Sequence, residues 1–297
     1  MCEVYFATAL GFKILGTFGG NMTESSIFSG RTLVVAFEGW NDAGESASGA
    51  ARLLIQSVNA KPISDLDSQN FYDFQFARPQ AFINPNGKRE FRWPTTNCYR
   101  PELSDLFDLR ILLGVEPSRN WIDFSKEIAD VVDAEEIDAV IFLGAMLSDA
   151  PHTRPISITA TTTNETVAVE AKAEMSMYEG PVGILSILAA EFELRGLPTM
   201  FLWAAVPHYV HNGPVPKATL ALVSELEKYL GIEFDHGELA NEVFKWERAV
   251  DELTEGDEDL AEYVAALEKS RDEIDGATGE TIAAEVEKFL RDSDDER

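Results

Sequence analysis

Most residues that could do chemistry stand in the segments that follow four short apolar runs of the chain, and Glu179 stands before a predicted helix. Carboxylates and histidines predominate among them, and these side chains serve as general acids, general bases and ligands in proteins. The candidate site residues are Glu38, Trp40, Asn41, Asp42, Glu116, His152, Thr153, Arg154, Glu179 and His208. Glu38 and Glu116 could form an acid and base pair. The alternative is that Arg154 or Arg119 holds one of them as an internal ion pair.

The turn from Glu38 to Gly44 raises the question of phosphate binding. Glycine-spaced turns between a strand and a helix hold phosphate in nucleotide-binding folds, because unpaired amides and the helix dipole meet there. This turn has neither of the usual glycine spacings and contains no lysine. Asp42 and Glu45 form a capping-box pattern, which predicts that the helix supplies its own carboxylate. We therefore expect Asp42 to cap the helix and the turn to repel phosphate.

Metal and nucleophile chemistry find little support in the residue pattern. His208 and His211 are spaced for a metal but lack a clearly placed carboxylate, so no metal or cofactor is predicted. No Gly-x-Ser-x-Gly elbow is present, and Cys98 has no histidine nearby in the sequence. Trp40 and Trp203 are expected to pack rather than to stack on a ligand.

An alternation of strands and helices must position these residues. Apolar runs at 33–37, 109–115, 139–143 and 199–206 predict buried strands, and 43–58, 123–134 and 181–195 show helical periodicity. This order predicts an α/β fold with a largely parallel sheet. Because the carboxyl ends of parallel strands meet at one edge of a sheet, the candidate residues should share one rim.

Two further segments depart from this alternation. Residues 71–93 alternate aromatic and polar residues around Asn86-Gly87, which predicts an inserted β-hairpin. A lone ribbon with so much aromatic surface should lie in a subunit interface. After a core at 31–235, residues 236–291 form a helical subdomain whose apolar stripes require a partner surface, so we expect a lid over the rim. A disordered tip is predicted at 292–297 and a poorly packed leader at 1–30, with Met22 an alternative start.

Composition limits the partners. The formal net charge of −28 repels nucleic acid and anionic lipid, and no apolar run is long enough to span a bilayer. Cys2 and Cys98 cannot form a disulfide framework, which fits a reducing cytoplasm. We expect a cytoplasmic protein that binds neither nucleic acid nor membrane.

Six phrases of the sequence occur together in a pattern that resembles a known family. EGWNDAGESA, DFQFARP, GVEPSRNW, LGAMLSDAPHTRP, YEGPVGI and VPHYV are similar to the actinobacterial branch of the proteasome assembly chaperone family, named after the second eukaryotic assembly chaperone. The resemblance implies a three-layer αβα core like that of purine nucleoside phosphorylases and related hydrolases. It also implies a hairpin used in oligomerisation, with a homotrimer expected, and a helical part beside a ligand pocket.

Two functions follow as hypotheses. The first is a homo-oligomeric, assembly-chaperone-like or ligand-binding protein without catalysis, acting on itself, a protein partner or a small molecule. The alternative is a hydrolase or phosphorylase-type enzyme that uses the rim carboxylates and histidines. A rim filled by its own side chains favours the binding protein, and an enclosed pocket with Glu38, Arg154 and His208 pointing inward favours the enzyme or a ligand sensor.

Overall fold

The computed structural model describes residues 26–66, 68–102, 108–210 and 213–274. Most of the predicted leader, including Met22, lies outside these residues, as do His211, the end of the predicted helical subdomain and the tip. The rest of the leader is a short 3-10 turn, Ser26–Phe28, and its Phe28 is buried in the core. The folded core therefore begins a few residues earlier than predicted.

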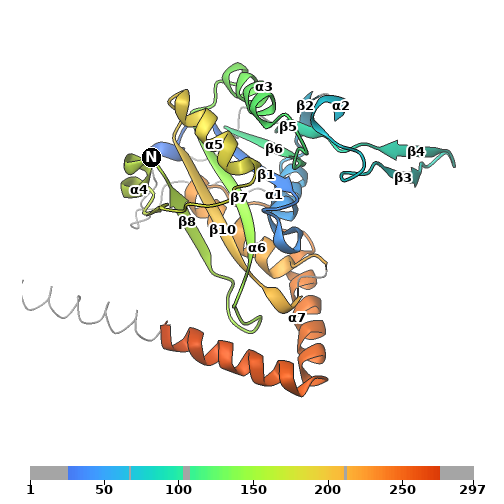
Figure 1. Cartoon of the computed structure of the whole chain (residues 1–297), viewed down its shortest axis with the longest axis vertical. Helices are drawn as coiled ribbons and strands as arrows, with labels where there is room; N and C mark the ends of the chain where they lie inside the picture. The colour runs from blue at the N-terminus through green and yellow to red at the C-terminus, as the bar shows by residue number, and fades with distance from the viewer. Residues whose placement is uncertain (1–25, 67, 103–107, 211–212, 275–297) are drawn as a thin grey trace, which may run out of the picture.

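An eight-stranded sheet in the order β2-β5-β6-β1-β7-β10-β8-β9 forms the middle layer (Figure 1). The four runs predicted as strands become its parallel centre, in which β1 pairs with β6 and β7, and β7 pairs with β10. The flanking strands β5 and β8 are antiparallel to this centre. The strands are β1 (Thr32–Glu38), β2 (Lys61–Asp65), β5 (Thr96–Arg100), β6 (Leu109–Val115), β7 (Ala139–Ser148), β8 (Ile158–Thr162), β9 (Glu174–Met175) and β10 (Thr199–Pro207).

Helices cover both faces of the sheet, which confirms the predicted three-layer α/β fold. Helices α1 and α6 pack on one face, and α3 and α5 pack on the other. The helices of the core are α1 (Ser46–Ser57), α2 (Ser68–Phe71), α3 (Trp121–Ala134), α4 (Glu165–Glu170), α5 (Ile184–Leu194) and α6 (Pro216–Leu230). Helix α6 ends at Gly231 in a left-handed conformation (φ 64°), as glycine allows at low cost.

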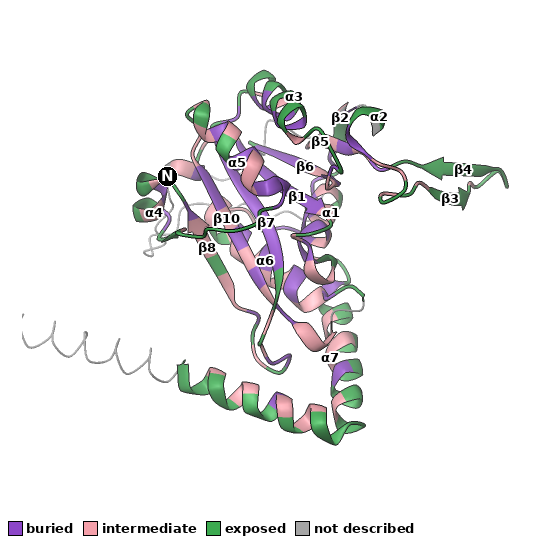
Figure 2. Ribbon diagram, in the orientation of Figure 1, coloured by how far each residue is buried: buried purple, intermediate pink, exposed green. Residues whose placement is uncertain are grey.

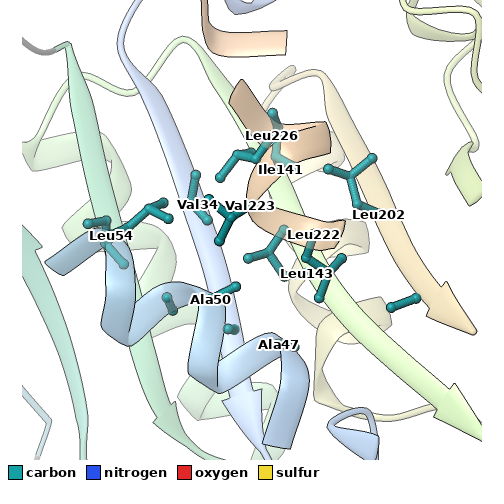
Figure 3. Close-up of a cluster of buried hydrophobic side chains, with 14 of the residues drawn as sticks. Val34, Ala47, Ala50, Leu54, Ile141, Leu143, Leu202, Leu222, Val223 and Leu226 are labelled. Carbon is teal, nitrogen blue, oxygen red and sulfur yellow. The ribbon is translucent and has the colours of Figure 1, made fainter. Parts of the chain in front are cut away.

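The face that carries α1 and α6 is built from small and aliphatic side chains. Ala47 and Ala50 of α1 are fully buried and let the helix approach β1 and β7 closely (Figure 3). Leu222 and Val223 of α6 fill the space beside them. Close packing of this kind explains why the start of α1 consists almost entirely of small residues.

The opposite face is built from larger aromatic side chains. Phe124 of α3 packs edge-to-face on Phe37 of β1 and on Phe71. Tyr72 joins this core, and its hydroxyl donates to the carbonyl oxygen of Val115 at 2.9 Å. Burial raises the pKa of Tyr72 to about 12. The hairpin predicted over 71–93 included Tyr72, and this part of the prediction is wrong because Tyr72 is a core residue.

An ionic cluster around the buried Arg110 closes the amino end of the sheet. Glu135, at the end of α3, accepts hydrogen bonds from Arg110 of β6 at 2.7 Å and from Arg100 of β5 at 2.5 Å. The side chain of Arg110 is 6% exposed and that of Glu135 is 13% exposed. This cluster ties α3 to two strands.

The hairpin is shorter than predicted and projects from one edge of the molecule (Figure 1). Strands β3 (Gln80–Ile83) and β4 (Arg89–Arg92) pair with each other in a separate two-stranded sheet, and every residue in them is exposed (Figure 2). Gly87 adopts a φ of 75° at the predicted turn. The inserted hairpin is therefore present around Asn86-Gly87, and residues 71–79 of the predicted range lie outside its strands.

Further helices follow the core towards the carboxyl-terminal end of the described residues. Helix α7 (Leu239–Glu255) packs on α6, and a further helix covers 258–274 of the described residues. Figure 1 shows this last helix turning away from α7 and passing below the ends of β7 and β10. We refer to residues 239–274 as the tail.

Candidate functional site

Most of the candidate residues follow the carboxyl ends of the parallel strands β1, β6, β7 and β10. They fall into two groups with different partners. The β1-end group consists of Glu38, Trp40, Asn41, Asp42 and Glu116. The loop-tail group consists of Asp149, His152, Thr153, Arg154 and His208 with the tail residues that contact them.

Asp42 occupies the amino end of α1 with its own carboxylate. Its Oδ1 accepts hydrogen bonds from the backbone N–H of Ala47 at 2.8 Å and of Ser48 at 3.0 Å. Burial raises the pKa of Asp42, and the two backbone hydrogen bonds oppose that effect. The expected capping role is confirmed, but Glu45 takes no part through its side chain. An anion approaching these amides would meet a carboxylate already in place.

Glu116 and Glu38 are also engaged by the core. Glu116 accepts from the backbone N–H of Ile184 at the start of α5 (2.9 Å) and from that of Trp40 (3.4 Å). Glu38 pairs with Arg52 of α1. The expectation that Arg154 or Arg119 holds one of these carboxylates is therefore wrong, because each has a nearer partner.

His152 is the buried centre of the loop-tail group. Its Nδ1 lies 2.8 Å from the Tyr209 hydroxyl and its Nε2 lies 3.0 Å from Oδ1 of Asp251 in α7. Its carbonyl oxygen accepts from Nζ of Lys217 in α6 at 2.6 Å. These contacts hold the loop after β7 to three other elements, η3 (His208–Val210), α6 and α7.

The helix at 258–274 completes the group. Arg154 donates to both carboxylate oxygens of Asp272 at 2.8 Å, and Glu268 lies 3.3 Å from it. The hydrogen bond from Arg154 lowers the pKa of Asp272. Tyr263 donates to Asp149 at 3.1 Å, and His208 lies beside that carboxylate, 3.3 Å away.

A hollow of about 210 Å³ opens between this loop and the last helix. Arg154 and Asp149 contribute to its wall from the core, and Leu267 and Arg271 contribute from the tail. The polar side chains around it are already engaged with one another, so the hollow offers few free groups to a ligand.

The remaining candidates lie apart from both groups or serve the backbone. Glu179 is exposed in the segment before α5. Arg119 donates to the carbonyl oxygens of Gln69 and Tyr72 at 2.8 and 2.9 Å. Trp40 is exposed, contrary to the expectation that it packs. Within the described ranges, no cluster of three or more histidine, cysteine or acidic side chains is arranged to hold a metal ion.

Sequence reasoning missed the tail partners of the loop. Asp251, Glu268 and Asp272 lie about a hundred positions after the residues that they contact. The available signal was the apolar stripe of Leu260, Tyr263, Val264 and Leu267, which predicted that this helix needs a partner surface. Val264 is indeed buried.

Comparison with known proteins identifies the family of this chain. The family model described as PAC2 family matches residues 36–254, which span the sheet, the hairpin and α7. The chain belongs to the PAC2 family. A comparison with curated proteins gives no significant match.

Solved structures of similar proteins share the fold. A PAC2 family protein from Streptomyces avermitilis is 38% identical over 78% of this chain and 99% of its own, with a TM-score of 0.71. A proteasome-assembly chaperone homologue from Mycobacterium tuberculosis is 37% identical over the same shares, with a TM-score of 0.70. An archaeal proteasome activator from Pyrococcus furiosus, 20% identical over 77% of this chain and 94% of its own, shares the fold at a TM-score of 0.60. Among the described residues, no helix is long and apolar enough to cross a membrane.

Proposed function

We propose that this PAC2 protein is a cytoplasmic, homo-oligomeric binding protein with assembly-chaperone-like action and no catalysis. The observation that carries the proposal is the hairpin, which exposes apolar side chains away from the core. The named role of the Mycobacterium relative as a proteasome-assembly chaperone homologue supports proteasome subunits as the first partners to test.

The exposed apolar side chains of the hairpin favour contact with another protein surface over contact with water. Ile83 is 63% exposed and Phe91 is 57% exposed, while Trp93 packs edge-to-face on Phe74 at its base. Arg92 lies over the Phe82 ring, 5.6 Å from its centroid. An isolated two-stranded ribbon is at best marginally stable in water, so a partner surface would stabilise it. A homotrimer, with the hairpin in each interface, is the assembly that we propose.

The state of the rim carboxylates favours binding over catalysis. Glu38 pairs with Arg52, Asp42 caps α1, and Glu116 accepts from two backbone N–H groups. Carboxylates held in this way fix loops in place, whereas a general acid or base must reach a substrate proton. This favours a binding protein over the hydrolase or phosphorylase alternative.

We further propose that the tail acts as a lid on the loop after β7. The contacts of Arg154 with Asp272 and of Asp149 with Tyr263 support this role. Since these residues are exposed or half-buried, their contacts are weaker than those of the core and suit a part that opens.

The experiment that tests self-assembly compares the wild type with a hairpin variant, Ile83→Ser with Phe91→Ser, by light scattering at micromolar concentration. Both side chains are exposed, so the variant should fold normally. Its measured mass should fall from that of the oligomer to that of a monomer. A wild type that is monomeric would overturn the proposal, and so would a hairpin variant of unchanged mass.

The partner is tested by adding the protein to purified proteasome subunits and following assembly intermediates by native gel. Assembly-chaperone action predicts faster formation of the complete particle and a retained complex with an intermediate. Unchanged assembly kinetics with no retained complex would exclude the proteasome as the partner, while leaving self-assembly intact.

A further inference from the structure

The segment 176–183 between β9 and α5, which we call the strap, lies over part of the sheet. The N–H of Ser176 donates to the carbonyl oxygen of Thr162 at 2.8 Å, at the β8 edge. At the other end, Gly183 lies so close to Asn41 and Glu116 that a side chain there would meet them. The strap therefore runs from β8 towards β1, and in Figure 2 it crosses in front of β10 and β7 as an exposed ribbon.

Large apolar side chains are exposed around the strap. Met146 shares the face of β7 that carries α5, since it lies an even number of residues after Phe142, and it is 51% exposed. Met177 is 86% exposed. We define the strap surface as Trp40, Met146, Met175, Met177, Tyr178 and Val182, all exposed. Methionine and aromatic residues are enriched in protein interfaces, where flexible methionine adapts to its partner.

The rim of the strap surface is acidic. Glu174 and Glu179 are exposed along its length, and Glu116 lies at its end beside Gly183. The partner that fits such a surface therefore combines apolar side chains with positive charge.

The hairpin has this chemistry, although the chain as a whole carries a formal net charge of −28. From Arg78 to Trp93, its charged residues are Arg78, Lys88, Arg89 and Arg92 against Glu90. Ile83 pairs with Arg89 and Ala81 pairs with Phe91, so all four project from one face of the ribbon. One hairpin face thus presents two exposed apolar side chains beside a cation.

We propose that the hairpin of one copy docks on the strap surface of a second copy. This inference rests on the proposed self-assembly and names the surface that receives the hairpin. Arg89 would meet the acidic rim while Ile83 and Phe91 cover the exposed methionines. The occupant is a second copy because this chain itself supplies the basic and apolar partner that the surface requires.

The placement of the two surfaces determines the kind of assembly. The hairpin projects near β2 and β5 at one edge of the sheet, and the strap begins beside β8 and β9 at the other edge. Contacts between two different patches are heterologous and close into a ring when the rotation permits. Each copy would give its hairpin to one neighbour and receive that of another, as a trimer requires.

The experiment uses two full-length variants that each lose one side of the contact. The hairpin variant is Ile83→Ser with Phe91→Ser, and the strap variant is Met177→Arg with Glu179→Arg, which repels a basic hairpin. A matched control, Glu252→Arg with Leu253→Arg, makes the same exchange at exposed positions of α7. Light scattering measures the mass of each protein alone and of the two variants mixed.

We expect both variants to be monomers, the control to keep the wild-type mass, and the mixture to form a one-to-one complex through its single intact contact. A strap variant of wild-type mass would overturn the docking surface while self-assembly stands. No complex in the mixture would also overturn the docking of the hairpin on the strap surface. A photo-crosslinker at position 177 that captures residues 1–25 of its own chain would also overturn the inference. A monomeric wild type would remove the proposed self-assembly itself.

Discussion

The molecule contains two networks of arginine and carboxylate side chains, and the two lie in different environments. At the amino end of the sheet, the carboxylate of Glu135 is held by Arg100 and Arg110. At the loop-tail group, the guanidinium of Arg154 is held by Glu268 and Asp272. The central pairs of the two networks differ in burial. Arg110 is 6% exposed and Glu135 is 13% exposed, with Arg100 at 43%, whereas Arg154 is 33% exposed and Asp272 is 55% exposed.

The difference shows which network stabilises the fold. A buried charge that loses its partner is strongly destabilising, because the remaining charge stays out of water. An exposed pair loses little, since water and salt replace the partner. We therefore assign the Glu135 network to the stability of the core and the Arg154 network to the position of the tail.

The largest expected effect is that of Glu135→Gln. This change removes the negative charge that compensates buried Arg110 and should lower the free energy of unfolding by about 3 kcal/mol at pH 7. Urea unfolding followed by circular dichroism measures it. The control is Glu136→Gln, which alters a neighbouring carboxylate that is exposed. Equal losses in the two variants would contradict the special role of Glu135.

The second prediction concerns the pH dependence of that difference. Burial alone would raise the pKa of Glu135, but the hydrogen bonds from Arg110 and Arg100 outweigh it and hold the pKa below its usual 4.5. A lowered pKa in the folded state contributes stability above the unfolded-state value, and this contribution is lost as the pH falls. The free energies of unfolding of the wild type and of Glu135→Gln should therefore differ by the same amount at pH 7 and at pH 5.5. Below pH 4.5 this difference should shrink with each step in pH. A difference that grows in acid would refute the assignment.

The smallest effect on stability is expected from Arg154→Gln. The melting temperature should not change measurably, because the ion pairs it removes are exposed. Hydrogen exchange in residues 149–154 and in the last described helix should rise by about tenfold, since the bidentate contact with Asp272 is lost. Exposed Arg248→Gln serves as the control. In 1 M NaCl the wild type should approach the variant, because salt screens exposed charges. Unchanged exchange in the variant would show that Arg154 does not hold the tail.

The sequence predicted the parts of the fold whose signals are local. The runs at 33–37, 109–115, 139–143 and 199–206 lie in β1, β6, β7 and β10 because strands buried on both faces are apolar throughout. Strands outside the parallel centre, such as β5, carry mixed residues and gave no such signal. Tyr72 was assigned to the hairpin because its alternation with polar neighbours resembles a ribbon, while its actual partners, Thr96 and Val115, are distant in the chain.

The candidate site shows the same limit. The capping role of Asp42 was predictable, since its amide partners follow within a few residues. The partner of Arg154 was not, because several distant carboxylates could have reached it and only the fold of the tail selects Asp272. The predicted lid and the grouping of the site residues accordingly stay predictions.

Strand β7 is longer than its neighbour β1, and this difference affects how movement can pass between the two ends of the site. β7 pairs with β1 only as far as Phe142, yet it continues beside β10 to Ser148. The last residues of β7 and β10 thus form a two-stranded ribbon that extends past the end of β1. The ribbon is anchored where the N–H of Ala145 donates to the carbonyl oxygen of Asn41 at 2.8 Å. Two-stranded ribbons twist more readily than wide sheets. A movement of the loop and the tail at this end is therefore taken up as twist of the two strands before it reaches the anchored turn after β1.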